Sequence, residues 1–211
     1  MTAQAARIIF VRHGQTAHNR EKRLQGHHDA PLDDTGEGQA QKLARHLRAL
    51  GMQNPTIHSS DLKRAHATAR AIQAEVGGTL ATFAALREIH LGDWEDQLYA
   101  DIEQADPEGY ARFWGGEADY RPPQGESPAE VAGRVLAHVQ AHWPQPGETL
   151  LVVSHGVAIT GVLCKLLGRD YGQVWQSREI MHQNTGFSVL NVDPATHEIL
   201  GQELAQHPHL A

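Results

Sequence analysis

Two histidines, each following a short apolar run and each followed by glycine, are the residues of this chain best suited to chemistry. His13 lies in the run RHGQT at 12–16, directly after the apolar segment 8–11. His155 follows the apolar segment 149–153 and one serine. Short β-branched runs are typical of buried strands, and ligands of open α/β sheets bind outside the carboxyl ends of the strands. A guanidinium suits a phosphate and a neutral imidazole is a competent nucleophile, so the pattern predicts phosphoryl chemistry.

Two further segments add charged side chains in a consistent order. A third short strand over 56–58 leads into a helix that carries Arg64, and a loop after the next apolar stretch carries Glu88. With these four segments the chain resembles the histidine phosphatase superfamily, also called the phosphoglycerate mutase-like family, from Arg7 to about Leu200. The resemblance implies a three-layer α/β/α sandwich whose six-stranded sheet is mostly parallel with one antiparallel strand. It also implies chemistry without a metal or a cofactor.

The resemblance assigns roles to individual residues. It implies that His13 accepts the phosphoryl group and that Glu88 donates a proton to the leaving group. The residues expected to hold the phosphate or the rest of the substrate are Arg12, Asn19, Gln25, Arg64, His155 and Gly156.

Elementary chemistry supports these roles. Two arginines and two histidines can hold the oxygens of one phosphate while its charge redistributes. A hydrogen bond from the other ring nitrogen of His13 to a backbone carbonyl would fix its neutral tautomer. His155 could stay protonated and donate to a phosphate oxygen. Glu88 would first protonate the leaving oxygen and then activate water.

Other chemistries lack their signatures. The chain has no Gly-x-x-x-x-Gly-Lys-Ser/Thr loop for nucleotide phosphates and no Gly-x-Ser-x-Gly nucleophile elbow. His27, His28, His207 and His209 lack a His-x-x-x-His or cysteine-rich spacing, so we expect no metal.

Composition indicates one intracellular enzyme. The 211 residues suit a single domain, 1–211, and the one cysteine, Cys164, lies in an apolar helix face where we expect it buried. Arg7 and Arg12 interrupt the first apolar run, so we expect no secretory signal, no membrane span and a cytoplasmic location. A net charge of −7 disfavours nucleic-acid binding. The expected partner is a small phosphorylated metabolite, and the oligomeric state stays open.

Strand and helix signals alternate, as in sheets covered on both faces. Thr35 is the expected N-cap of one helix and Asp61 of another, and Ser127 with Glu130 forms a capping box. The expected helices are 35–50, 61–76, 128–143 and 157–167, and a late hairpin joins strands 186–192 and 197–200.

The segment 94–125 interrupts this alternation and is expected to form a short helical cap over the phosphate pocket. It holds half of the chain's twelve aromatic residues, and eight acidic residues against two basic ones give it a net charge of −6. We expect at least one aromatic to face the substrate and the acidic charge to repel a second anionic group. The tract 92–95 resembles the Gly-x-Trp-Glu-Gly of the phosphatase branch, except that Asp96 replaces the last glycine.

These features predict an acid-active phosphatase that hydrolyses phosphomonoesters through a phosphohistidine on His13. A cofactor-dependent phosphoglycerate mutase is the alternative enzyme, although mutases carry a longer, more basic insertion here. From another class, a noncatalytic phosphoprotein-binding or scaffold member of the fold is disfavoured because all five catalytic residues are present. Sugar phosphates, phosphoglycerates, nucleotide-pathway intermediates and ribazole phosphate all remain open as substrates.

Overall fold

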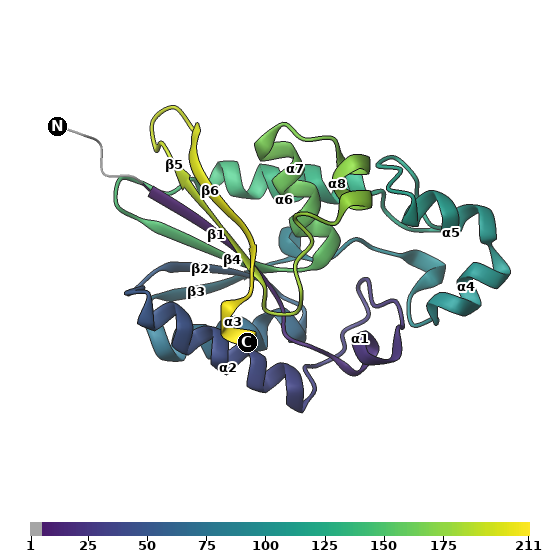
Figure 1. The fold of residues 1–211 in the computed structure, drawn as a ribbon, viewed down its shortest axis with the longest axis horizontal. Coiled ribbons are helices and arrows are strands. Elements are labelled where there is room, and N and C mark those ends of the chain that lie inside the picture. Colours follow the sequence, from purple (N-terminus) through teal and green to yellow (C-terminus); the bar gives the residue numbers. More distant parts are fainter. Residues whose placement is uncertain (1–5) are drawn as a thin grey trace.

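Six strands form one sheet in the order β3-β2-β4-β1-β5-β6 in the computed structural model, which describes residues 6–211 (Figure 1). The strands are β1 (Ala6–Arg12), β2 (Thr56–Ser60), β3 (Thr79–Phe83), β4 (Thr149–Ser154), β5 (Phe187–Val192) and β6 (Ile199–Gln206). The first four run parallel, and β5 is antiparallel to both of its neighbours. The expected sheet, mostly parallel with one antiparallel strand, is therefore confirmed.

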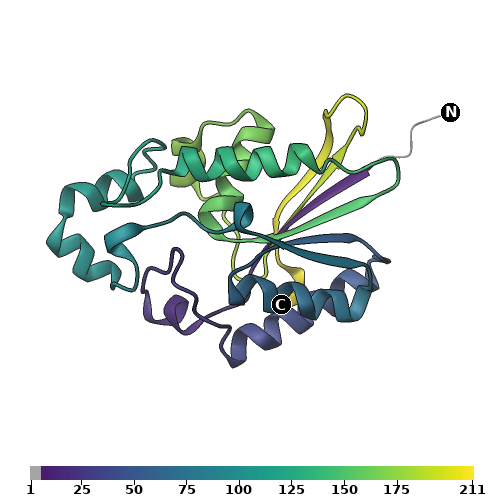
Figure 2. The ribbon, with the colours of Figure 1, turned by 180° about the vertical axis from the view of Figure 1, so that it is seen from behind.

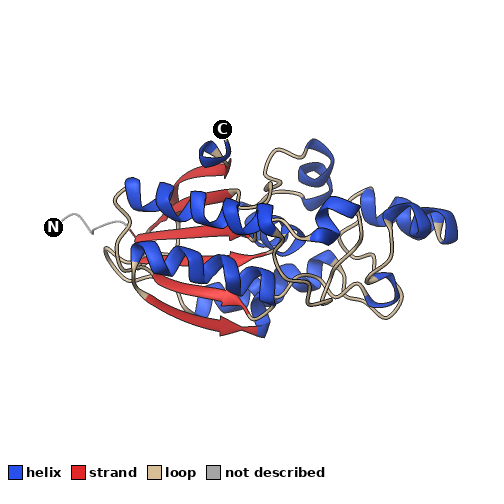
Figure 3. Ribbon diagram, turned by 90° about the horizontal axis from the view of Figure 1, so that it is seen from below, coloured by secondary structure: helices blue, strands red, loops and turns tan. Residues whose placement is uncertain are grey.

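Both faces of the inner strands are covered. In β1, Ile8 and Phe10 belong to one apolar cluster while Ile9 and Val11 belong to the other, as the two-residue period of a strand requires. The covering helices are α2 (Asp34–Ala49) and α3 (Lys63–Val76) on one face and α6 (Pro128–Ala141) and α7 (Gly156–Leu167) on the other. Figure 2 shows α6 and the α2–α3 pair on opposite sides of the sheet, and Figure 3 shows α2 and α3 in front of the sheet, running in roughly the same direction as the strands. The three-layer arrangement is confirmed.

The expected starts of two helices are wrong. Asp33, not Thr35, caps α2, because its carboxylate accepts the backbone N–H three residues further on at 2.8 Å. Helix α3 begins without a side-chain cap. Asp61, the expected cap, instead accepts two hydrogen bonds from the Arg87 guanidinium at 2.7 and 2.6 Å, and this bidentate pair replaces the capping interaction.

Two other sequence predictions describe the structure closely. The capping box of Ser127 and Glu130 is present at the start of α6, and that helix ends two residues before the expected end. The late strands do form an antiparallel hairpin, but β6 continues to Gln206 instead of ending at Leu200. Since β6 is an edge strand with no buried residue, its second half carries no apolar alternation that could have revealed it.

The cap is helical, as expected, and extends beyond the carboxyl ends of the parallel strands (Figure 1). It contains α4 (Tyr99–Ala105) and α5 (Pro107–Trp114), while α1 (Ala17–Glu21) and α8 (Tyr171–Ser177) lie outside it. The indole N–H of Trp175 in α8 donates to the backbone carbonyl of Trp114 at 3.1 Å, which ties the cap to the rest of the fold. Asp96, which stands where the Gly-x-Trp-Glu-Gly motif has its last glycine, has φ 61°. This is the left-handed conformation that glycine favours, so the loop keeps that backbone shape with aspartate in place of glycine.

Other expectations concern burial and membranes. Cys164 is buried, as expected, and burial raises the pKa of its thiol to about 11. Among residues 6–211, no helix has the length and apolar character needed to cross a bilayer. Residues 1–5 of the expected domain 1–211 lie outside the described part of the chain.

Candidate active site

The carboxyl ends of β1 and β4 bring the two predicted histidines together. Arg12 and Ser154 are register partners at the last position of these neighbouring strands. The backbone N–H of His13 donates to the carbonyl of Ser154 at 3.1 Å. The imidazole rings of His13 and His155 consequently lie with their centroids 5.0 Å apart. Adjacent parallel strands thus place residues 142 positions apart side by side.

The backbone fixes one ring nitrogen of His13. Its Nδ1–H donates to the carbonyl oxygen of Gly14 at 2.7 Å, which is the hydrogen bond predicted from chemistry. This assignment leaves the lone pair on Nε2. Burial, followed by the charges of Arg64 and Arg12, holds the pKa of the imidazole well below its usual range. His13 is therefore neutral near pH 7, the state that a nucleophile requires.

Two arginines flank the histidines, and backbone carbonyls orient both guanidiniums. Arg64, only 1% exposed, donates to the carbonyls of Gly26 and His28 at 2.7 and 2.8 Å. Burial lowers its pKa to about 10, so the group stays charged near neutral pH. Arg12 donates to the carbonyl of His182 at 2.7 Å, and its buried Nε has no partner among the described residues. Fixed guanidiniums of this kind suit the oxygens of a phosphate.

The structure favours a neutral His155 over the protonated form that the sequence left open. The Nε–H of Arg64 donates to His155 Nδ1 at 3.2 Å, so that nitrogen is an acceptor and the ring proton is on Nε2. Burial, then the charges of Arg64 and the neighbouring imidazole, hold the pKa of His155 well below its usual range. Its Nε2 is buried and has no partner among residues 6–211. A neutral His155 can still donate one hydrogen bond, because the proton is already on the unpartnered nitrogen.

The carboxylate of Glu88 is held at the start of α7. Its Oε1 accepts the backbone N–H groups of Ile89 and Ala158, both at 3.0 Å, and its Oε2 accepts that of Val157 at 3.2 Å. The first turn of a helix has free N–H groups, so a carboxylate there satisfies donors that otherwise lack a partner. These bonds fix the orientation of Glu88 beside the helix that follows His155.

Arg134 supports the loop that carries Glu88, and the sequence analysis missed it. From α6 its guanidinium donates to the backbone carbonyls of Ala85, Arg87 and Glu88 at 3.0, 2.7 and 2.6 Å. It also donates to both carboxylate oxygens of Glu126 at 3.0 and 2.9 Å. No local pattern identifies this residue, since a helix carries many arginines and only the tertiary fold shows which one meets the loop.

Asn19 and Gln25 lie at the site with their amide oxygens already bonded. The hydroxyl of Thr16 donates to Gln25 Oε1 at 2.9 Å, and the backbone N–H of Thr16 donates to Asn19 Oδ1 at 3.2 Å. The NH₂ groups are therefore the parts available to an anion. Asn184, which the sequence analysis also missed, donates to the carbonyl of His13 at 3.1 Å and to Asn19 Oδ1 at 3.2 Å.

A cavity of about 310 Å³ lies at these strand ends. Of the eight predicted site residues, seven line it: Arg12, His13, Asn19, Gln25, Arg64, Glu88 and Gly156. The eighth, His155, is fully buried. The cap contributes Tyr99 and Trp114, so aromatic side chains of the cap do reach this cavity, as expected.

A second hollow, the side chamber, adjoins this cavity and measures about 390 Å³. Its walls are Tyr99, Tyr110, Trp114, Trp175, Gln176, Arg178 and Met181. All of these except Tyr110 and Gln176 line the catalytic cavity as well. The two hollows therefore offer a substrate one polar end for a phosphate and one aromatic end for the rest of the molecule.

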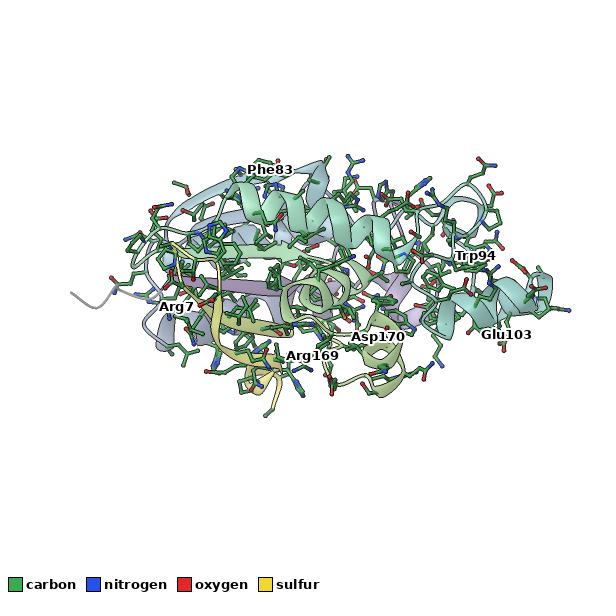
Figure 4. The ribbon with its side chains drawn as sticks, turned by 90° about the horizontal axis from the view of Figure 1, so that it is seen from above. Arg7, Phe83, Trp94, Glu103, Arg169 and Asp170 are labelled. Atoms are coloured by element: carbon green, nitrogen blue, oxygen red, sulfur yellow. The ribbon has the colours of Figure 1, made fainter. Side chains whose placement is uncertain are left out.

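The charge at these walls differs from the sequence expectation. None of the acidic residues of the cap lines either hollow, and Glu103 lies at the outer end of the cap (Figure 4). Glu117 is exposed and paired with Arg112. In contrast, Arg23 and Arg178 line the catalytic cavity. The acidic side chains of the cap therefore do not form the walls of either hollow, and the repulsion of a second anionic group by the cap stays a prediction.

Metal-ligating side chains gather at two other places. Among residues 6–211, the clusters of three are His58 with His138 and His142, and His18 with His28 and Asp96. Neither cluster includes a predicted catalytic residue. His138 and His142 of the first cluster have a His-x-x-x-His spacing that was not noticed in the sequence; His138 lies in the last turn of α6 and His142 directly follows that helix.

The chain is similar in sequence and in overall fold to known proteins. A family model described as histidine phosphatase superfamily (branch 1) matches residues 8–203. Phosphoglycerate mutase-like protein 4 of Arabidopsis thaliana is 34% identical over 200 residues, which cover 93% of this chain and 85% of that protein. The probable phosphoglycerate mutase GpmB of Escherichia coli is 33% identical over 182 residues, 86% and 82% of the two chains. A solved mycobacterial glucosyl-3-phosphoglycerate phosphatase complexed with VO3 has a TM-score of 0.77 at 33% identity, and the match covers 87% of this chain and 92% of that one.

Proposed function

This chain belongs to branch 1 of the histidine phosphatase superfamily, and from that premise we propose that it is a metal-independent phosphatase of small phosphorylated metabolites. The observation that carries the proposal is the state of His13. Its Nδ1–H is bonded to a backbone carbonyl at 2.7 Å, and its pKa lies well below the usual range. A neutral imidazole with its lone pair on Nε2, set between two fixed guanidiniums, is suited to attack phosphorus.

The first half of the proposed reaction forms a phosphohistidine. The Nε2 lone pair of His13 attacks phosphorus, the ester P–O bond breaks, and its electron pair goes to the leaving oxygen. Glu88 supplies the proton that this oxygen takes up. Arg12 and Arg64 hold the other phosphate oxygens while charge redistributes over them, and His155 donates through Nε2.

The second half of the reaction releases inorganic phosphate. A water molecule attacks phosphorus and gives one proton to the carboxylate of Glu88, which restores the acid. The P–N bond breaks and its electron pair returns to Nε2 of His13. Glu88 is only half-buried and lines the cavity, so water has access to its carboxylate. This access supports hydrolysis over transfer to a second substrate molecule, which requires that water be excluded.

A direct assay separates this enzyme from a noncatalytic binder of phosphorylated partners. The purified chain should release p-nitrophenol from p-nitrophenyl phosphate at weakly acidic pH with EDTA present. A His13→Ala variant measured alongside serves as the blank. Saturable phosphate binding without any turnover by the unsubstituted chain would favour the binder.

A cofactor-dependent phosphoglycerate mutase is the second candidate, and one observation favours it. Arg23 and Arg178 add positive charge to the cavity wall, as a substrate with more than one anionic group requires. Incubation with 3-phosphoglycerate and catalytic 2,3-bisphosphoglycerate distinguishes the two enzymes. A mutase forms 2-phosphoglycerate, whereas the proposed phosphatase releases inorganic phosphate.

The side chamber bears on the choice of substrate. Tyr99, Trp114 and Trp175 line both hollows and present aromatic surface next to the phosphate site. Such surface suits a leaving group that carries a ring, and Arg178 on the same wall suits a carboxylate on that group. We therefore place ring-bearing phosphomonoesters, with or without a carboxylate, first in a screen of phosphorylated metabolites.

A further inference from the structure

Three histidines meet away from the catalytic cavity, between the sheet and one covering helix. His58 lies in the middle of β2, opposite Val152 of β4, and His138 and His142 lie in and directly after the last turn of α6. One ring nitrogen from each comes within 4.8 Å of the other two. Figure 4 labels Phe83, whose ring packs 4.5 Å from that of His138, near one end of α6, well away from the cap.

The three rings are held in a compact arrangement. Nδ1 of His58 and Nε2 of His138 lie 3.0 Å apart in a hydrogen bond. The ring of His142 stacks on that of His138 with centroids 4.4 Å apart and meets that of His58 edge-on at 4.8 Å. His58 and His138 are each 7% exposed, whereas His142 is exposed to solvent. The cluster is thus preformed, with one open side through which an ion can enter.

Two of these nitrogens already lie close to the spacing of ligands around one metal ion, and the nitrogen of His142, within 4.8 Å of both, must move nearer to complete the set. Zinc binds imidazole nitrogen at about 2.0–2.1 Å, so two tetrahedral ligands lie about 3.3 Å apart. The 3.0 Å pair of His58 and His138 needs only a small movement to reach that distance. The ion would replace their shared hydrogen bond, and the donor ring would keep its proton by moving it to its other nitrogen.

The protonation states also suit metal binding. Burial lowers the pKa of both His58 and His138 to about 4, so each is neutral near pH 7 and holds a lone pair. Nδ1–H of His142 donates to the backbone carbonyl of His138 at 2.8 Å, which leaves Nε2 as the ligand atom. A ligating histidine commonly fixes its other nitrogen in this way.

We propose that His58, His138 and His142 form a binding site for a zinc-class divalent transition ion, with water as the fourth ligand. Three imidazoles without a carboxylate suit Zn²⁺, Co²⁺, Ni²⁺ or Cu²⁺ and not Mg²⁺ or Ca²⁺, which prefer oxygen. The ion ties α6 to β2 and therefore stabilises the folded chain. The site is separate from the catalytic cavity and does not depend on the proposed hydrolysis.

The test is a titration of the metal-free protein with Zn²⁺ followed by calorimetry and thermal unfolding. One ion should bind per chain, and at ten times Kd the melting temperature should rise by about 3–6 °C. Co²⁺ should give a visible absorption spectrum of imidazole coordination that Zn²⁺ removes. Sulfate, a tetrahedral anion of similar size to phosphate that does not precipitate Zn²⁺, should leave the binding unchanged if the ion lies outside the catalytic cavity.

Two variants locate the ion. His142→Gln removes an exposed ligand without opening the core and should weaken Zn²⁺ binding by about 100-fold or more, because even a group that only orients a ligand is worth about 10- to 100-fold. His28→Gln, which removes a ligand of the other cluster, is the matched control and should bind Zn²⁺ as the unsubstituted chain does. The proposal is overturned if no stoichiometric binding occurs, if His142→Gln binds normally, or if sulfate or His28→Gln abolishes binding.

Discussion

The Nε–H of Arg64 donates to Nδ1 of His155 at 3.2 Å, and this contact decides which nitrogen of His155 carries the ring proton. The same guanidinium also donates to two backbone carbonyls, so Arg64 cannot move without releasing His155. In the proposed reaction one arginine therefore binds the phosphate and also orients a second donor beside it. An ammonium in its place keeps the charge but loses the planar set of three donors.

We accordingly expect Arg64→Lys to lower kcat/KM for p-nitrophenyl phosphate by about 10²- to 10³-fold, a typical cost of removing an oriented donor. Arg70→Lys is the control, because Arg70 is exposed on the same helix. Steady-state kinetics on the two variants check this. Near-normal turnover by Arg64→Lys would show that the charge alone suffices.

Glu88→Gln should affect substrates according to their leaving groups. Alkyl phosphates, whose leaving oxygen needs a proton, should lose about 100-fold or more in kcat/KM. The loss on p-nitrophenyl phosphate should be smaller, since p-nitrophenolate departs without a proton. Glu117→Gln, an exposed change in the cap, should leave both substrates unaffected. Equal losses on both substrates would assign Glu88 to positioning or to activation of water only.

Stability should fall as the pH decreases below about 6.5. Burial lowers the pKa of His182 to about 3, whereas in the unfolded chain it titrates near 6.5. Between these values the unfolded state binds a proton that the native state does not, so stability is complete above pH 6.5 and declines toward pH 3. For His182 alone the free energy of unfolding should drop by about 2 kcal/mol between pH 7 and pH 5.

Urea unfolding at the two pH values, without added metal, measures this effect. In a His182→Gln variant the fall in the free energy of unfolding between pH 7 and pH 5 should be smaller by about 2 kcal/mol, whatever the stability of the variant at pH 7. A free energy of unfolding that is constant or higher at pH 5 would contradict a buried, neutral histidine.

Arg178 should select for a carboxylate on the substrate. Its guanidinium lines both the catalytic cavity and the side chamber. Arg178→Gln should raise KM by about 10-fold for phosphomonoesters whose leaving group bears a carboxylate, and added salt should narrow the difference by screening. KM for p-nitrophenyl phosphate should hardly change. Arg112→Gln is the control, because Arg112 lies in the cap but outside both hollows. If Arg112→Gln raised KM for the carboxylate-bearing substrates as much as Arg178→Gln does, only the net charge of the protein would matter.

The sequence predicted those features that depend on local pattern and on motif order. Apolar runs ending in histidine indicated β1 and β4, and the parallel arrangement of such strands implied that His13 and His155 meet. Seven of the eight predicted site residues line one cavity and the eighth is buried at the same strand ends, because each comes from a recognisable motif. The hydrogen bond from His13 Nδ1 to a carbonyl followed from the chemistry that a nucleophile needs.

The errors concern features that depend on the tertiary fold. Asp61 has the pattern of a helix cap, but Arg87 lies close enough in space to claim its carboxylate. The net charge of the cap was counted along the sequence. The charge that a substrate meets depends instead on which side chains line the cavity, and the sequence does not show this. The sequence left the charge of His155 open, because its burial beside two guanidiniums, which lowers its pKa, cannot be recognised from one strand and one helix.

The central claim is that His13 carries the phosphoryl group during turnover. Rapid quenching of the enzyme with ³²P-labelled substrate should trap an acid-labile, base-stable phosphate, and mapping the peptides should place it on His13. His13→Ala should form none and should lose on the order of 10⁴-fold or more in activity while remaining folded. A phosphate on another residue, the absence of any phosphoenzyme during turnover, or substantial activity in His13→Ala would contradict the account.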